Sequence, residues 1–112
     1  MDAVFVELPA FSRFRHAFFD DTAFSALQQL LLRNPTAGDV IPETGGLRKI
    51  RFPDARRQKG TRGGLRVIYY WWSGHSQFWL FTAYGKDMQD DLTAEQKKLL
   101  RKMLEAEIRS RS

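Results

Sequence analysis

Two strongly β-prone runs, separated by a short turn, constrain the fold more than any other feature of this chain. They are residues 65–72, LRVIYYWW, and residues 77–83, QFWLFTA, and the turn between them reads SGHS. Runs rich in β-branched and aromatic residues on either side of a Gly/Ser turn are typical of an antiparallel hairpin. We therefore expect these two strands to form the centre of a sheet.

The residues before this hairpin predict one strand and two helices. Residues 3–8, AVFVEL, end at a proline and favour a short strand. Phe11, Phe14 and Phe18 follow at helical spacing and indicate a brief helix. A second helix is expected over residues 22–33, with Asp20 or Asp21 as its cap and Asn34-Pro35 as its end.

The remaining segments complete an α+β fold. Residues 36–46 predict a connecting loop, residues 47–52 a strand with one apolar and one charged face, and residues 53–64 a solvent-facing hairpin loop. Thr93 and Gln96 form a capping box for a terminal helix over residues 93–109. We expect one domain over residues 1–112, a small antiparallel sheet with two N-terminal helices and one C-terminal helix, in the order β-α-α-β-β-β-α.

Positive charge is concentrated in one part of the chain. Residues 48–66 hold eight Lys or Arg residues and one acid, a net charge of +7, whereas the other residues hold ten cations and twelve acids, a net of −2. Such a cluster is either a solvated charged loop or a surface for a polyanion, because eight neighbouring like charges repel one another unless something neutralises them. The concentration favours a nucleic-acid partner.

Several common classes of site are not supported by the sequence. The chain has no cysteine, and it contains no P-loop, no GxGxxG and no Ser-His-Asp order. His16 and His75 are expected to be surface residues, and the acids Asp87, Asp90 and Asp91 favour the positive end of the last helix over a divalent-cation site. We therefore expect no metal and no cofactor.

The cellular location of the protein is predicted from the absence of a signal peptide and of a membrane span in the sequence. Residues 1–11, MDAVFVELPAF, show neither the basic region nor the long apolar region of a signal peptide. No apolar stretch approaches the roughly 18 residues that a membrane span needs. We expect a cytoplasmic protein with no membrane contact, which agrees with the absence of cysteine.

Three motifs give the chain a resemblance to a known family. They are GGLRKIR at residues 45–51, KGTRGGLRVIYYW at residues 59–71 and FTAYGKDMQDDLTAEQ at residues 81–96. With these motifs the chain resembles, over nearly its whole length, the RelE-like toxins of bacterial type II toxin–antitoxin modules, close to the HigB branch. The resemblance implies a RelE-like fold and a ribosome-dependent mRNA endonuclease.

The resemblance also implies a chemistry and its partners. Such toxins cleave mRNA without a metal: the ribose 2′-OH attacks the adjacent phosphate and leaves a 2′,3′-cyclic phosphate and a 5′-OH. This needs a base, an acid and cations around the phosphate. The implied partners are the ribosome, mRNA and a cognate HigA-like antitoxin with a helix-turn-helix, which would dock either on exposed apolar faces of the first two helices or on the basic groove.

Site roles are carried over from the family residue by residue. Arg51 and Arg66 are expected to stabilise the phosphate and the transition state, and Lys49 to act as base or backbone contact. In RelE itself, a catalytic arginine and a catalytic tyrosine follow the Gly-Lys pair. In this chain Asp87 follows Gly85-Lys86 and no tyrosine comes later, so the expected acid is Tyr84 or Lys86. The expected RNA contacts on the basic strand and its loop are Arg48, Arg56, Arg57, Lys59 and Arg62.

Two other functions remain open on the sequence. A ParE-like toxin shares the fold and inhibits DNA gyrase, but such a chain has no need of a dense basic loop. A catalytically inactive RNA-binding module would keep the fold without turnover, and the missing tyrosine is consistent with it.

Overall fold

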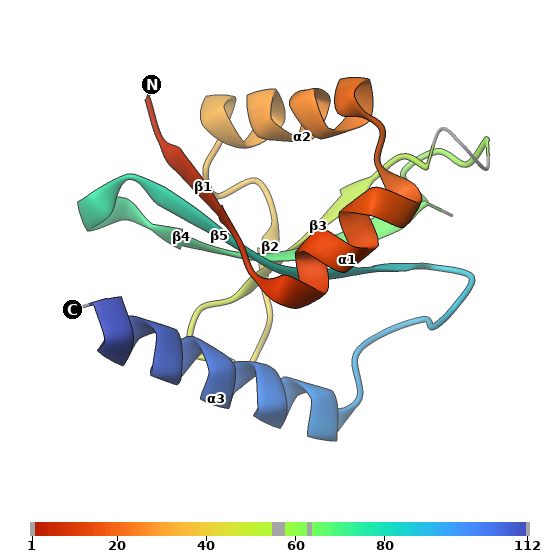
Figure 1. The fold of residues 1–112 in the computed structure, drawn as a ribbon. Helices are drawn as coiled ribbons and strands as arrows, with labels where there is room; N and C mark the ends of the chain where they lie inside the picture. The colour runs from red at the N-terminus through yellow and green to blue at the C-terminus, as the bar shows by residue number, and fades with distance from the viewer. Residues whose placement is uncertain (1, 55–57, 63, 112) are drawn as a thin grey trace.

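A computed structural model describes residues 2–54, 58–62 and 64–111 of the chain. Its helices and strands follow one another as a β-α-α-β-β-β-β-α series (Figure 1). The elements are β1 (Val4–Glu7), α1 (Pro9–Phe18), α2 (Asp21–Arg33), β2 (Asp39–Val40), β3 (Arg48–Phe52), β4 (Leu65–Trp72), β5 (Gln77–Gly85) and α3 (Ala94–Arg111). In the described ranges, no helix is both long and apolar enough to cross a bilayer.

The sheet has five strands in the order β1-β5-β4-β3-β2, so the predicted hairpin of β4 and β5 lies inside the sheet as expected. The prediction of a purely antiparallel sheet is wrong, because β1 pairs in parallel with β5, from Val4 opposite Gln77 to Glu7 opposite Leu80. The predicted connecting loop also contains β2, a two-residue strand paired with β3. Both differences involve edge strands, whose direction depends on distant chain segments and not on local periodicity.

Helices cover both faces of the sheet. The N-terminal helices α1 and α2 pack on one face and α3 packs on the other (Figure 1). Phe11 of α1 and Phe24, Leu27 and Leu31 of α2 are buried against the first face. These residues are part of the core, whereas Phe14, Phe18, Leu30 and Leu32 on the same two helices are half-buried. Docking of an antitoxin on these helices stays a prediction.

The helix ends follow the signals in the sequence. The Asp20 side chain accepts a hydrogen bond from Ala23 N at 2.7 Å and caps α2. At α3 the capping box is confirmed, because Gln96 N donates to Thr93 Oγ1 at 3.1 Å and Thr93 N donates to Gln96 Oε1 at 2.9 Å. Each cap satisfies backbone N–H groups that the first turn of a helix leaves without a partner.

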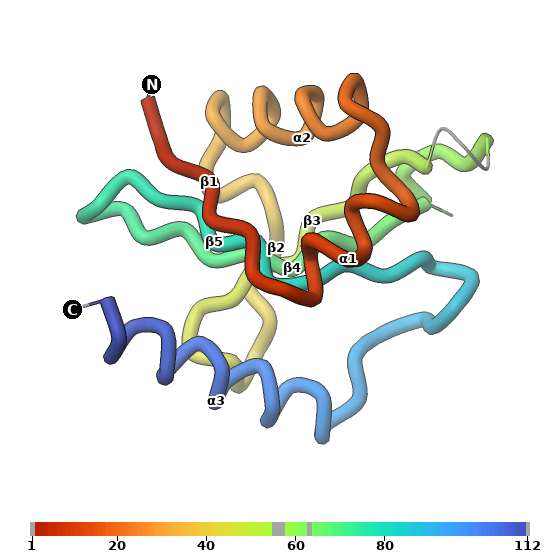
Figure 2. Tube along the Cα trace, in the orientation of Figure 1, coloured from red at the N-terminus to blue at the C-terminus, as the bar shows by residue number. Residues whose placement is uncertain are grey.

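The pairing of β4 with β5 contains a register shift, which decides which residues of the two strands lie opposite each other at the end of β5. Tyr69 lies opposite Leu80 and Ile68 opposite Thr82, so Phe81 is an extra residue between them. Beyond this bulge Tyr84 lies opposite Arg66. After Gly85 the chain turns back and runs into α3 (Figure 2).

Candidate functional site

The basic strand β3 divides its charges between the two faces of the sheet. Ile50 and Phe52 are buried beneath α1 and α2. Since successive side chains of a strand point to opposite faces, Lys49 and Arg51 lie on the other face, which α3 covers in part. Two of the predicted catalytic residues thus share one side of the sheet.

Three predicted catalytic residues form a row across β3, β4 and β5. Arg51 lies opposite Arg66, and Arg66 lies opposite Tyr84. Directly opposed residues of antiparallel strands have Cβ atoms only about 5 Å apart. The fold therefore places two guanidinium groups and a phenol in adjacent positions, although they are up to 33 residues apart in the chain.

Arg66, in the middle of this row, is buried with 4% of its surface exposed. Its Nη1 donates to Thr61 O at 2.8 Å and to Leu65 O at 3.2 Å, and its Nη2 donates to Arg62 O at 2.8 Å. The guanidinium thereby fixes the end of the β3–β4 hairpin loop. Its expected contact with a phosphate stays a prediction, and its positive charge also acts on Tyr84.

Tyr84 carries the one buried side-chain polar atom, among the described residues, that has no hydrogen-bond partner. Burial raises the pKa of its hydroxyl, the Asp91 carboxylate raises the pKa further, and the Arg66 guanidinium lowers it. A phenol is already protonated at neutral pH at its ordinary pKa, and the net rise makes it a weaker acid. The feature that suits a proton donor is the hydroxyl hydrogen, which has no acceptor in the described part of the protein.

Arg51, at the outer end of the row, is exposed. Lys49, one position further along this face of β3, places its Nζ 3.1 Å from Asp91 Oδ1, and 28% of its side chain is exposed. Among the described residues, Lys49 is therefore the β3 cation on this face that has a carboxylate as its ion-pair partner.

A short acidic segment, residues 86–91, provides that carboxylate and two others. Lys59 Nζ lies 3.5 Å from Asp87 Oδ2, and Lys86 Nζ lies 3.4 Å from Asp90 Oδ1 and 3.1 Å from Asp90 O. Together with the Lys49–Asp91 pair, three predicted site lysines are paired with the three aspartates of this segment. This gathers Lys49, Lys59 and Lys86 around one segment.

These pairs correct the interpretation of the aspartates as part of the helix cap. Thr93 and Gln96 cap α3, while the carboxylates of Asp87, Asp90 and Asp91 face lysines. Asp91 Oδ1 also accepts a hydrogen bond from Leu92 N at 2.7 Å, and this bond and the one from Lys49 lower the pKa of Asp91. Within the described part of the chain, no group of three or more acids and histidines is arranged to hold a metal ion.

The other predicted RNA contacts do not gather at one place. Arg48 points to the opposite face of β3 from Lys49, and its Nη1 donates to Gly38 O at 2.8 Å and Thr36 O at 3.4 Å. It anchors the loop before β2 instead of facing Arg51. Arg62 is exposed on the hairpin loop, and Arg56 and Arg57 lie outside the described residues.

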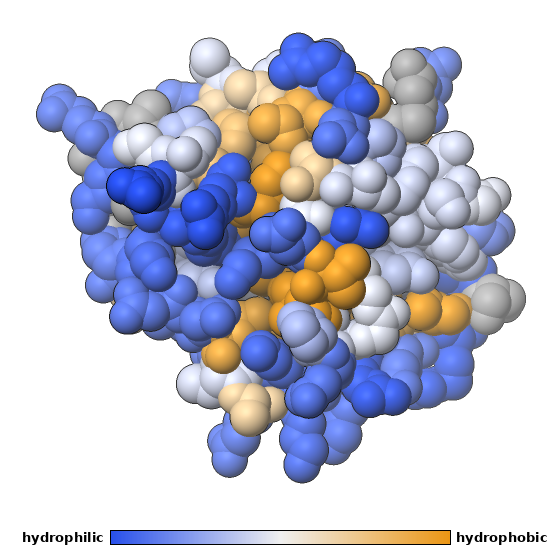
Figure 3. Space-filling model, turned by 180° about the vertical axis from the view of Figure 1, so that it is seen from behind, coloured by the Kyte–Doolittle hydropathy of each residue, from blue (hydrophilic) through white to orange (hydrophobic). Residues whose placement is uncertain are grey.

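An open groove of about 780 Å³ runs beside the outer edge of β3. Its lining combines polar and apolar residues from α2, the loop after it, β3 and the hairpin loop, namely Leu30, Arg33, Asn34, Ala37, Asp39, Lys49, Ile50, Arg51 and Thr61. Seen from behind, the molecule is mostly hydrophilic, with apolar surface showing between the polar side chains (Figure 3). Arg51, a member of the row, and its neighbour Lys49 thus also line a groove of mixed polar and apolar character.

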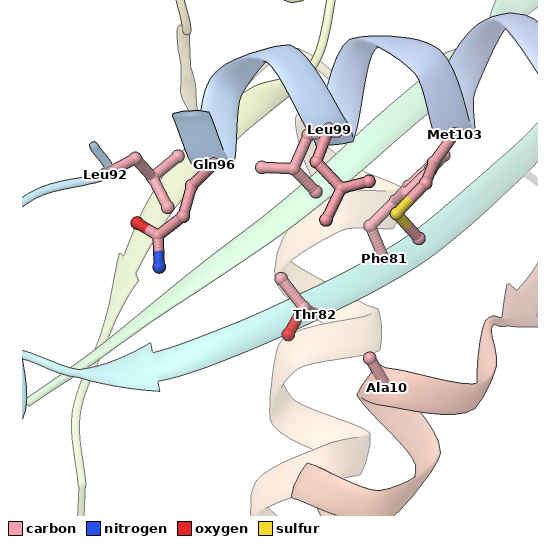
Figure 4. Close-up of a pocket in the computed structure, with 8 residues that line it drawn as sticks. Ala10, Phe81, Thr82, Leu92, Gln96, Leu99 and Met103 are labelled. Atoms are coloured by element: carbon pink, nitrogen blue, oxygen red, sulfur yellow. The ribbon is translucent and has the colours of Figure 1, made fainter. Parts of the chain in front are cut away.

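A second, smaller hollow of about 190 Å³ lies between α3, β5 and the start of α1 (Figure 4). Leu92, Leu99, Met103 and Phe81 line it, with Gln96 and Thr82 as its polar residues. Leu99 of α3 lines this hollow with an apolar side chain, and 59% of its surface is exposed. With no charged residue in its lining, this hollow is not suited to phosphate chemistry.

Sequence reasoning missed two features of the site. The pairing of residues 86–91 with the lysines had a signal, since an acidic run of opposite charge follows directly after Gly85-Lys86. The burial of Arg66 also had one, because this arginine opens an apolar run in a central strand. A scan of the chain against models of known protein families finds no match.

Proposed function

We propose that this protein is an endoribonuclease that binds RNA on the α3-side face of β3 to β5 and cleaves it without a metal. The observation that carries the proposal is the row of Arg51, Arg66 and Tyr84, which ends in a protonated phenol without a hydrogen-bond partner. Two cations beside a proton donor are what a phosphoryl transition state and its leaving oxygen require.

The proposed reaction is an attack of the ribose 2′-OH on the neighbouring phosphorus. The new bond joins O2′ to phosphorus, the bond from phosphorus to O5′ breaks, and the products are a 2′,3′-cyclic phosphate and a 5′-OH. After Asp91 has left it, Lys49 loses one proton to water, and the neutral amine then receives the 2′-OH proton, while Tyr84 donates its proton to O5′. Arg51 and Arg66 offset the negative charge that accumulates on the phosphate oxygens.

The biological setting of this proposal rests on the three motifs quoted above. It is the toxin of a type II toxin–antitoxin module, similar to RelE and HigB, which acts on mRNA at the ribosome and is neutralised by a HigA-like antitoxin. The exposed Arg62 and the paired Lys59 would contact RNA beyond the scissile phosphate. Basic residues beside a mixed groove are consistent with a single-stranded substrate.

The test compares two variants that each remove one phenolic oxygen from the same face of the sheet. Tyr84→Phe removes the proposed acid, whereas Tyr70→Phe alters a half-buried tyrosine of β4 that lies opposite Trp79 and outside the row. Each chain is induced in bacteria, and mRNA 5′ ends are mapped. We expect Tyr84→Phe to reduce cleavage at codons by about 100-fold or more, the scale of one general acid, and Tyr70→Phe to keep it.

Other results would assign the protein elsewhere. Unchanged cleavage by Tyr84→Phe would remove Tyr84 from the reaction. DNA damage linked to gyrase, with no cut mRNA, would favour the ParE-like function. RNA binding without any cuts from the unmodified chain would leave an RNA-binding module and overturn the nuclease.

A further inference from the structure

The acidic segment, residues 86–91, forms ion pairs with three lysines of the proposed site. Its three carboxylates contact lysines from three different places: Lys49 on β3, Lys59 on the hairpin loop and Lys86 at the start of the segment itself. A run of carboxylates on a set of lysines has the same chemistry as a run of phosphates on that set. The segment thus satisfies the cations that a polyanion would use.

These contacts are of a kind that a polyanion can replace. The aspartate side chains are 40%, 93% and 63% exposed at Asp87, Asp90 and Asp91. Ion pairs between exposed groups contribute little to stability and are screened by salt. The side-chain hydrogen bonds of the segment are also exposed, such as Gln89 Nε2 to Gln96 Oε1 at 3.1 Å. At its first residue, Lys86 N donates to the backbone oxygen of Gly64 at 2.9 Å, which holds the start of the segment in place.

The hydroxyl of Tyr84 gives a second, independent observation. It is buried without a partner, and the Asp91 carboxylate lies close enough to raise its pKa. A phosphate oxygen that is to receive a proton from this hydroxyl must come within hydrogen-bond distance of it. The same movement that frees Lys49 from Asp91 would remove the nearby negative charge from Tyr84.

We infer that the acidic segment is an intramolecular competitor for the RNA site, which single-stranded RNA displaces when it binds. The identity of the polyanion rests on the proposed function, while the competition rests on the three ion pairs. A site that is open only part of the time has an apparent affinity reduced by its open fraction. Removal of the carboxylates therefore raises the affinity for RNA.

The main experiment replaces the three aspartates together, as Asp87→Asn, Asp90→Asn and Asp91→Asn. The matched control removes three acids that lie outside the segment, as Asp2→Asn, Glu43→Gln and Glu105→Gln, so that both variants gain the same net charge. The probe is a single-stranded 2′-O-methyl RNA, which has no free 2′-OH to react. Binding is measured by fluorescence anisotropy over a range of salt concentrations.

We expect the segment variant to bind the probe about tenfold more tightly than the control variant, as when a site that is open about a tenth of the time becomes fully open. The affinity of the segment variant should also fall more steeply with salt concentration. In the unmodified chain, RNA displaces the aspartates, which then bind cations from solution and reduce the net release of cations; the variant has no such aspartates. Equal affinity of the two variants would overturn the inference, since the gain would then come from net charge alone. Failure of either to bind would overturn it as well.

A second measurement leaves the segment's charges intact. The chain has no cysteine, and Met88 lies within the segment with 64% of its surface exposed, so Met88→Cys offers a unique site for an environment-sensitive dye. Addition of the probe should change the dye's fluorescence, and an unchanged signal at saturating probe would contradict displacement. Displacement without mRNA cleavage would uphold the competitor and refute only the nuclease, whereas cleavage without displacement would do the reverse.

Discussion

Lys49 Nζ and Asp91 Oδ1 lie 3.1 Å apart, although the two residues are 42 positions apart in the chain. Their contact joins the basic strand β3 to the segment that leads into α3. This one contact links a predicted site lysine, the acidic segment and, through the charge of Asp91, the buried hydroxyl of Tyr84. A substitution at Asp91 therefore acts on the lysine, on the acidic segment and on Tyr84 together.

The first prediction concerns Tyr84. Because the Asp91 carboxylate raises the pKa of the Tyr84 hydroxyl, Asp91→Asn should lower that pKa. The measurement is an ultraviolet titration of tyrosinate, and the chain has three tyrosines in all. The same substitution in a Tyr84→Phe background should leave the titration of the other two unchanged, and a shift there would assign the effect to Tyr69 or Tyr70 instead.

The second prediction is a pH dependence of stability. The pKa of Asp91 is lowered in the folded protein, so its carboxylate binds a proton more readily in the unfolded chain. The stabilisation is therefore present at neutral pH and is lost as the pH falls through the depressed pKa of the folded state. The Tm difference between the unmodified chain and Asp91→Asn should shrink from neutral pH to about pH 2. A constant difference over that range would refute this linkage.

The third prediction separates a buried arginine from an exposed one. Arg66→Ala removes three hydrogen bonds to backbone carbonyls and should lower the free energy of unfolding by about 2–4 kcal/mol. Arg62→Ala removes the same charge from an exposed position and should change it by about 0.5 kcal/mol or less. Denaturant unfolding measures both, and equal effects would show that Arg66 does not hold the hairpin loop.

The fourth prediction uses two glycines of the same hairpin. A Cβ at Gly64 would lie 2.5 Å from Phe52 O and 2.6 Å from Gly60 O, whereas a Cβ at Gly60 would meet nothing within 4 Å. Since the atoms at Gly64 belong to the backbone, Gly64→Ala should cost about 1–3 kcal/mol of stability. Gly60→Ala is the control and should be near neutral. A neutral Gly64→Ala would mean that β3 and β4 can separate there without cost.

Most of the secondary structure could be predicted because it depends on neighbours in the sequence. β4 has the predicted bounds, the capping box of α3 is present, and α2 differs from its prediction by one residue at its start. The parallel pairing of β1 and the short strand β2 could not be predicted in this way. Their partners are decided by how the helices pack on the sheet, which no local pattern records.

The sequence alone determined the alternation that puts Lys49 and Arg51 on one face of a strand, the central hairpin and the concentration of cations. Only the tertiary structure decided that Arg51, Arg66 and Tyr84 stand in one row, that Arg66 is bound to carbonyls, and that residues 86–91 lie on the lysines. The physical reason is range. Periodicity and capping act over a few residues, whereas register, burial and ion pairing depend on segments that meet only when the chain has folded.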